Sequence, residues 1–331
     1  MLKIDIYLEL GRFNDYTCTK VLPYRCLRMP DPIDIRGYRA LPKSDCHNHC
    51  MLGGKRSVIE KHYGKKLGRF KAKQSGIGEL NSWIGNELRP FFQLPDAFEK
   101  AVEAAFIQAK VDGVTRLEMS IDVLFPMMFH VPATRIVTAL KYFHQAVAPE
   151  IDFCPELGFP RNKSMRSLLA GFEPFLNFDY FRSVDLYDDE FAQPVGNFKE
   201  LFRFAKGLGM KCKAHAGEFG SSDSVKEAAE VLELDAVQHG IGAAGSPAIM
   251  KWLADHQIPL NICPTSNIKL LIVRSYKTHP IRILFDHGVK VTINTDDALV
   301  FGDGVSEQFF KLRRAGVFTD EELDLIRMNG L

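Results

Sequence analysis

The chain has 331 residues, of which 46% are hydrophobic and 25% charged, and 42 Lys and Arg against 41 Asp and Glu leave a formal charge of +1. This composition is typical of a globular protein, and so small a net charge excludes the strong field that gathers nucleic acid or an anionic membrane. The apolar runs are too short for a membrane span, no two of the seven cysteines form a C-x-x-C pair and the first segment is charged, so we expect reduced thiols and a cytoplasmic location.

The N-terminal segment has the pattern of a β-hairpin. Residues 2–10 alternate apolar and polar side chains, which is typical of a half-buried strand. A turn at 11–15 and a second apolar segment at 21–29 supply the rest of the hairpin, and Pro30-Asp31-Pro32 then breaks the chain. We therefore expect residues 1–38 to form an N-terminal extension outside the main fold, which would comprise residues 39–331.

From about residue 41 onward, strand-like and helical patterns alternate. The helical patterns cover residues 95–110, 133–147, 197–207 and 222–233, and the strand-like runs lie near 41–48, 113–121, 151–158, 180–187, 210–216, 234–239, 257–262 and 289–295. Eight strands alternating with helices imply parallel pairing through right-handed crossovers. No G-x-G-x-x-G follows the first strand, which argues against an open doubly wound sheet. The pattern predicts an α/β fold, a (β/α)8 TIM barrel.

Residues 76–92 carry an apolar stripe with helical spacing, made of Ile77, Leu80, Trp83, Ile84 and Leu88. Such a stripe suits a helix that covers a substrate as a lid, and it equally suits a helix that packs in the core. Both interpretations stay open from the sequence.

Polar motifs stand where the expected strands end. They are His47-Asn48-His49, His215-Ala216-Gly217-Glu218, His239-Gly240, Cys263 to Asn267, and Asp296-Asp297. In a (β/α)8 barrel the carboxyl ends of all strands meet at one face, and active sites lie there. One histidine at such a position is commonly structural, but coincidence at several strand ends predicts an active site.

Three imidazoles and one carboxylate of this set suit a zinc ion. His47 and His49 lie two residues apart on one face of a strand, and His215 and Asp296 come from other strands. Four such groups close most of a zinc shell and leave one position for water, whose pKa the metal lowers to about 7. We therefore expect Zn²⁺, one ion per subunit, held by these four residues.

The remaining polar residues can move protons and hold a substrate. Gly217 permits a sharp turn that would bring the Glu218 carboxyl over the metal without ligating it. We expect Glu218 to donate a proton to a ring nitrogen and Asp297 to hold a substrate nitrogen. His239 is expected to be either a second proton acceptor or an electrostatic partner of the hydroxide.

The same segments resemble the adenosine deaminases, a family of the amidohydrolase superfamily. The resemblance spans about residues 41–330 and rests on Pro-Lys-Ser-Asp-Cys-His-Asn-His (42–49), Ala-His-Ala-Gly-Glu (214–218), Gln-His-Gly (238–240), Cys-Pro-Thr-Ser-Asn (263–267) and Asn-Thr-Asp-Asp (294–297). It implies that adenosine becomes inosine, through attack of activated water at ring carbon 6 and loss of ammonia. It makes His47, His49, His215 and Asp296 the zinc ligands, Glu218 and His239 the catalytic residues, and His49, Asp188 and Asp297 the substrate contacts.

Three departures from the family pattern bear on the substrate. Met51 stands where relatives that take adenosine carry an aspartate for the ribose 5′-hydroxyl, Tyr187-Asp188 replaces Ala-Gly after Leu186, and Ser120 replaces an arginine of the second strand. Adenosine is the expected substrate, and adenine, a 5′-modified adenosine or a modified purine is the alternative. A non-catalytic nucleoside-binding protein is the interpretation from another class. Between residues 61 and 73 a basic stretch forms either a solvated face or a rim for a 5′-phosphate.

Overall fold

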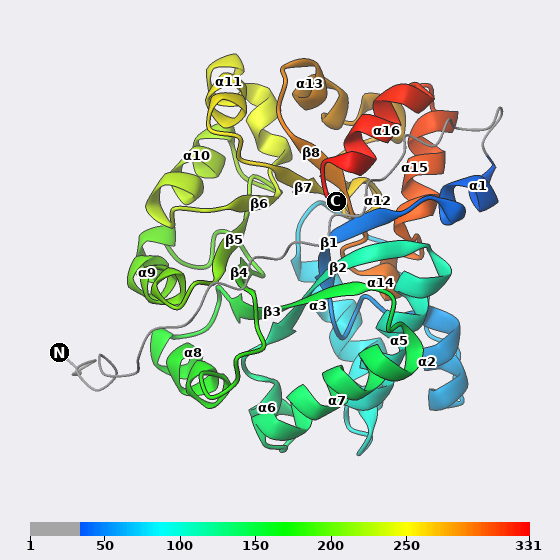
Figure 1. Ribbon diagram of the computed structural model, residues 1–331, viewed down its shortest axis with the longest axis vertical. Helices are drawn as coiled ribbons and strands as arrows, with labels where there is room; N and C mark the ends of the chain where they lie inside the picture. The colour runs from blue at the N-terminus through cyan, green and yellow to red at the C-terminus, as the bar shows by residue number, and fades with distance from the viewer. Residues whose placement is uncertain (1–33) are drawn as a thin grey trace.

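The computed structural model describes residues 34–331, so the expected hairpin lies outside the described residues (Figure 1). The described part begins with helix α1 (Ile35–Ala40), whose N-cap Asp34 accepts hydrogen bonds from the backbone N–H groups of Arg36 and Gly37. Tyr38 of this helix is buried against Phe309 and the neighbouring Phe310 of α15 (Val305–Arg314). The last residues of the expected extension therefore pack on the barrel.

Eight parallel strands form one sheet in the order β1 to β8. They are β1 (Lys43–His49), β2 (Val114–Asp122), β3 (Asp152–Pro160), β4 (Ser183–Tyr187), β5 (Lys211–Ala216), β6 (Ala236–His239), β7 (Leu260–Ile262) and β8 (Val291–Ile293). A bridge between Asn48 and Asp296 joins the first strand to the segment after the last, and the Asp296 N–H donates to the His47 carbonyl at 2.9 Å. Each strand overlaps an expected run, and the (β/α)8 barrel is confirmed.

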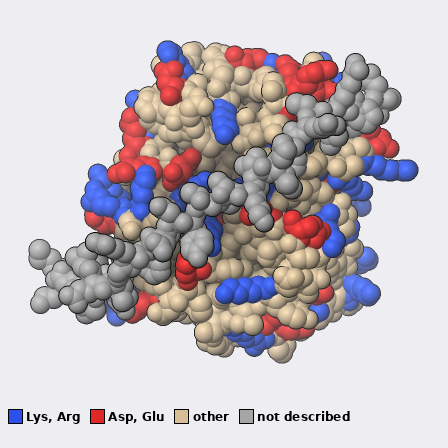
Figure 2. Space-filling model, in the orientation of Figure 1, with Lys and Arg blue, Asp and Glu red and all other residues tan. Residues whose placement is uncertain are grey.

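Helices surround this sheet (Figure 1). After α1 they are α2 (Arg56–Tyr63), α3 (Gly78–Trp83), the π-helix η1 (Ile84–Leu88), α4 (Arg89–Phe92), α5 (Ala97–Val111), α6 (Phe125–Met128), α7 (Ala133–Val147), α8 (Met165–Phe172), η2 (Glu173–Phe175), η3 (Val195–Phe198), α9 (Lys199–Gly207), α10 (Ser222–Val231), η4 (Ile241–Gly245), α11 (Pro247–Asp255), α12 (Pro264–Lys269), η5 (Tyr276–Thr278), α13 (Ile281–Asp286), α14 (Ala298–Phe301), α15 and α16 (Asp320–Met328). Within residues 34–331 none of these helices has both the length and the apolar character to cross a bilayer. Figure 2 shows basic and acidic side chains interspersed on one face, as a charge near zero predicts.

The interior of the barrel contains a layer of charged and amide side chains. Lys213 of β5 is almost fully buried, and its Nζ lies 2.6 Å from Glu118 Oε2 and 2.5 Å from Glu156 Oε2. Burial opposes the charge of Lys213, but the two carboxylates raise its pKa above the ordinary value. Asn261 and Gln238 extend the layer by donating hydrogen bonds to the Cys46 carbonyl. Branched aliphatic residues usually fill such interiors, so this barrel is held together partly by polar contacts.

Candidate metal and active site

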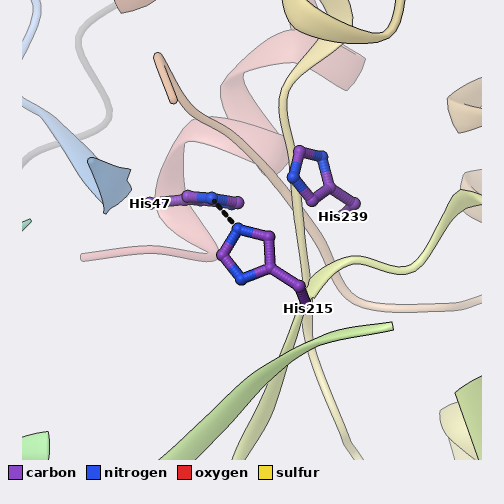
Figure 3. Close-up of side chains that lie close together, drawn as sticks. All are labelled: His47, His215 and His239. Carbon is purple, nitrogen blue, oxygen red and sulfur yellow. Dashed lines mark hydrogen bonds between the residues drawn. The ribbon is translucent and has the colours of Figure 1, made fainter. Parts of the chain in front are cut away.

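Side chains from three strands, and from the segment after β8, converge above this layer. His47 and His49 end β1, His215 lies near the end of β5, and His239 ends β6. Figure 3 shows the imidazoles of His47, His215 and His239 turned toward one another, and their ligand atoms lie within 4.8 Å of one another. His47, His49 and Asp296 form a second such group. The structure thus brings all four predicted zinc ligands together, with His239 beside them.

The hydrogen bonds of two of these imidazoles fit a bound cation. His47 Nδ1 faces the Asn261 carbonyl at 3.3 Å, and His215 Nδ1 faces the Leu186 carbonyl at 3.2 Å. Since a carbonyl oxygen only accepts, both Nδ1 atoms carry the proton. The two Nε2 atoms, which lie 3.0 Å apart, then present lone pairs to each other (Figure 3). A divalent cation coordinated by both relieves this repulsion, and Nδ1 held by a carbonyl is the usual support of a metal-binding histidine.

The electrostatics of the cluster favour a positive charge at its centre. Burial, followed by the neighbouring imidazoles, lowers the pKa of His47 well below its ordinary value, so this ring is neutral as a ligand must be. Burial alone would raise the pKa of Asp296, but the hydrogen bond from His49 and the surrounding imidazoles hold it far below the usual range. Burial opposes protonation of His49, yet Asp296 at 3.4 Å and Asp297 raise its pKa to about 10.

Glu218 lies beside the cluster in a form that can donate a proton. The preceding Gly217 has φ +65, and a Cβ there would meet Val225 at 2.2 Å, so the turn requires glycine. Glu218 Oε2 lies 3.6 Å from His239 Nε2. Burial, and then the charge of Asp296, raises the pKa of Glu218 well above its ordinary value. This shift favours the protonated carboxyl that a general acid needs.

The partners of His239 leave it neutral. Burial lowers its pKa to about 3. Its Nδ1 lies 3.4 Å from Asn267 Nδ2, and the Asn267 Oδ1 lies 3.2 Å from His279 Nε2. On the other side, His239 Nε2 is 3.9 Å from Asp296 Oδ2. Since Asn267 Nδ2 only donates, Nδ1 of His239 accepts, and the neutral ring carries its proton on Nε2, from which it can donate a hydrogen bond into the site.

Strained backbone marks three of the predicted site residues. Asp188, His239 and Asp296 have φ values of 77°, 61° and 60°, in the left-handed region that favours glycine. Non-glycine residues there cost on the order of 1–3 kcal/mol each and cluster at functional sites. No residue type in the sequence signalled this conformation.

Asp185 is a site residue that the sequence interpretation missed. It is fully buried, and its Oδ1 lies 3.4 Å from His215 Nδ1. Neither carboxylate oxygen has a hydrogen-bond partner among the described residues. Its signal was its place two residues before Tyr187 on a strand, where alternate side chains share a face. Asp185 is therefore placed to hold the ring of His215.

The cluster opens into a cavity of about 240 Å³. Asp188 and Asp297, the other predicted substrate contacts, line it, and Met51 lines it beside them. The apolar stripe of residues 76–92 is divided: Ile77, Leu80 and Ile84 line the cavity, whereas Leu88 is buried in the core. The substrate-covering interpretation therefore fits Ile77, Leu80 and Ile84, and the core interpretation fits Leu88. None of the basic residues between 61 and 73 lines the cavity.

Comparisons with known proteins agree with this geometry. A sequence model of the family described as adenosine deaminase matches residues 160–331. A protein of Treponema pallidum described as a putative adenosine/adenine deaminase is 31% identical over 283 residues, which cover 86% of this chain and 95% of the relative. The fold is similar to the crystal structure of an adenine deaminase from Arthrobacter aurescens, with a TM-score of 0.76, 23% identity and coverage of 87% and 92% of the two chains.

A second solved structure has the same fold. It is an amidohydrolase from Burkhoderia ambifaria with bound zinc, for which the TM-score is 0.77, the identity 21% and the coverage 88% of this chain and 85% of that one. At such identities the two solved structures support the barrel fold alone. The sequence matches decide the relationship: the chain belongs to the adenosine deaminase family, a group of metal-binding hydrolases in the amidohydrolase superfamily.

Proposed function

We propose that this protein is a zinc-dependent deaminase that hydrolyses the amino group of a 6-aminopurine to ammonia. The observation that carries the proposal is the pair of facing Nε2 lone pairs of His47 and His215, with Glu218, whose pKa burial raises, in the same cavity. Zn²⁺ held by these two histidines, His49 and Asp296 would supply an activated water as nucleophile.

The chain's own residues would then handle the protons. Glu218 gives its proton to the ring nitrogen next to the reacting carbon, which removes electron density from that carbon. His239, neutral because burial lowers its pKa, carries its proton on Nε2 and would orient the attacking oxygen by a hydrogen bond from that atom. The Oδ1 atom of Asp297 is buried without a partner among the described residues, and burial followed by the charge of Asp296 raises the pKa of this carboxyl well above its ordinary value. In its protonated form Asp297 would donate a hydrogen bond to another ring nitrogen. Closure of the site by apolar residues strengthens each of these contacts.

Adenosine is the expected substrate by family resemblance, and a specific observation favours free adenine as the second candidate. Met51 lines the cavity and its thioether is only a weak acceptor, so it cannot replace a carboxylate that binds a ribose hydroxyl. The cavity of about 240 Å³ is also small beside the range of roughly 300–1,000 Å³ typical of ligand sites. The descriptions of the relatives from T. pallidum and A. aurescens support the same two candidates.

The direct test is ammonia release by the zinc-loaded protein with adenine, adenosine, 2′-deoxyadenosine and AMP as separate substrates. Glu218→Gln should lower kcat by about 10²–10⁴-fold while the zinc content stays unchanged, because the amide cannot donate the proton. Glu230→Gln on α10 is the matched control, since Glu230 is exposed and contacts only Lys226 of its own helix at 3.6 Å. Absence of ammonia from every purine, with zinc bound, would contradict the proposal and favour a non-catalytic nucleoside-binding protein.

A further inference from the structure

A second polar wall of the cavity lies on β2 and β4, away from the predicted catalytic residues. Its members are Ser120 and Asp122 of β2 and Tyr187 at the end of β4. The Tyr187 ring lies 5.3 Å from the ring of His49, measured between centroids. A purine whose amino carbon sits over the metal cluster would therefore reach this wall with the rest of its rings.

Ser120 is the observation that points to a ligand. Only 4% of the residue is exposed, it lines the cavity, and its hydroxyl has no hydrogen-bond partner among the described residues. Leaving a buried hydroxyl unpaired is costly, and native structures usually supply a partner. A group of the bound substrate is the partner that this position can receive.

Asp122 and Tyr187 are fixed in place beside it. The Tyr187 hydroxyl donates to Asp122 Oδ2, and Asp122 Oδ1 accepts the Leu124 N–H at 2.7 Å. Each oxygen keeps a second lone pair, so this part of the wall accepts hydrogen bonds. These hydrogen bonds hold Asp122 and Tyr187 in place before a ligand binds, as expected for a preorganised binding site.

Gly158 of β3 makes room for this wall. A Cβ at this position would lie 2.5 Å from Ser120 Oγ and 2.9 Å from Tyr187 Cε1. Any larger residue would push both side chains out of place. The three strands are therefore shaped around the hydroxyl groups of Ser120 and Tyr187.

The charge of the cavity decides what this wall can bind. Among residues 34–331 no Lys or Arg lines the cavity, whereas five carboxyl-bearing residues do: Asp122, Asp188, Glu218, Asp296 and Asp297. A phosphate would meet carboxylates without a cationic side chain to pair with. An uncharged N–H or O–H donor would instead satisfy the acceptors.

We propose that Ser120, Asp122 and Tyr187 form a specificity subsite that binds a ring N–H or a hydroxyl of an uncharged aminopurine and discriminates against nucleotides. This inference rests on the proposed function, because it assigns the recognition of the substrate to residues outside the reacting centre. These three residues position the substrate and take no part in proton transfer.

The test is steady-state kinetics of the zinc-loaded protein with the purine that the wild type deaminates. Ser120→Ala should raise KM by about 3–10-fold and leave kcat within about twofold, the size expected for one neutral hydrogen bond. Asp122→Asn keeps an acceptor for the Leu124 N–H and a partner for the Tyr187 hydroxyl but removes the charge. It should raise the KM of the uncharged purine by about tenfold, as expected for a charged acceptor, and narrow the preference for that purine over AMP.

Tyr180→Phe is the matched control, since it also removes a buried hydroxyl without a partner among the described residues, and Tyr180 does not line the cavity. Its KM should equal that of the wild type. Unchanged KM values in both Ser120→Ala and Asp122→Asn, with melting temperatures like the wild type, would overturn the subsite. If Asp122→Asn does not fold, Ser120→Ala decides alone.

A binding experiment distinguishes failure of the subsite from failure of the proposed function. If the wild type releases ammonia from no purine, calorimetric binding of adenine to wild type and Ser120→Ala tests the subsite without turnover. Weaker binding by the variant supports it, whereas equal binding, or none to the wild type, overturns it.

Discussion

Replacing Lys213 by methionine removes the central cation of the barrel interior. Methionine has nearly the same length, so the change leaves little empty space and acts mainly on charge. It leaves Glu118 and Glu156, which lie 2.6 Å and 2.5 Å from the lysine Nζ, without the partner they share. Arg116 still pairs with Glu118 at 2.8 Å, but Glu156 then retains only the Ser183 hydroxyl at 2.7 Å.

The expected loss follows from the burial of this group. Breaking a buried ion pair by removing one partner costs about 3–5 kcal/mol. For a domain of roughly 300 residues, an unfolding entropy of about 2.1 cal/mol/K per residue converts this loss to a fall in Tm of about 5–8 °C. We expect that shift for Lys213→Met at pH 8, measured by circular dichroism during thermal unfolding.

The loss should depend on pH. Burial raises the pKa of Glu156 to about 7, despite the opposing charge of Lys213. A carboxyl whose folded-state pKa lies above its unfolded value destabilises the fold increasingly as pH rises from about 4.5 through its folded pKa. Without Lys213 that pKa rises further, so the deficit of Lys213→Met should be smaller at pH 5 than at pH 8.

Lys251→Met is the control, because Lys251 is three-quarters exposed and pairs only with Asp255 of its own helix. It should change the stability by less than about 0.5 kcal/mol. A Lys213→Met protein as stable as the wild type at pH 8, or a deficit that is the same at pH 5 and pH 8, would refute the reasoning.

Three further predictions concern the metal, its support and the backbone. A strong chelator should lower Tm and abolish turnover, and added Zn²⁺ should restore both; a Tm that does not respond would contradict the proposed ligand set. Asp185→Asn should weaken zinc binding by about 10–100-fold in a chelator competition, because a neutral amide replaces the carboxylate beside His215 Nδ1, and an unchanged affinity would exclude this role. Gly113→Ala should lower the free energy of unfolding, measured in urea, clearly more than Gly209→Ala does. Both glycines have positive φ, but only at Gly113 would the new Cβ lie 1.9 Å from the Arg39 carbonyl oxygen. Equal losses of stability in the two variants would contradict the clash.

The order of strands and the position of the site could be predicted because both depend on short stretches of sequence. His47, His215 and His239 each lie near the end of a short strand-like run, and the carboxyl ends of parallel strands meet at one face whatever the details of packing. The predicted bounds differ by a few residues because strand ends depend on neighbouring strands.

The contacts that could not be predicted join distant residues. Lys213 meets Glu118 across 95 residues, and Tyr187 meets Asp122 across 65. Such pairs follow from the register of neighbouring strands, which no short pattern specifies. The left-handed backbone of Asp296 is likewise imposed by the surrounding fold, since aspartate adopts extended and helical conformations more readily.

The contact between β1 and the segment after β8 makes formation of the metal cluster depend on closure of the barrel. Two predicted ligands come from opposite ends of the strand order, His49 from β1 and Asp296 from the segment after β8, and Thr295 donates its N–H to Asp45 across 250 residues of chain. The cluster therefore comes into being only when the last strand has docked on the first, and closing so long a loop is entropically costly. An ion bound by both His49 and Asp296 would hold the first strand and the segment after the last strand together. Zinc uptake during refolding would then report closure of the barrel.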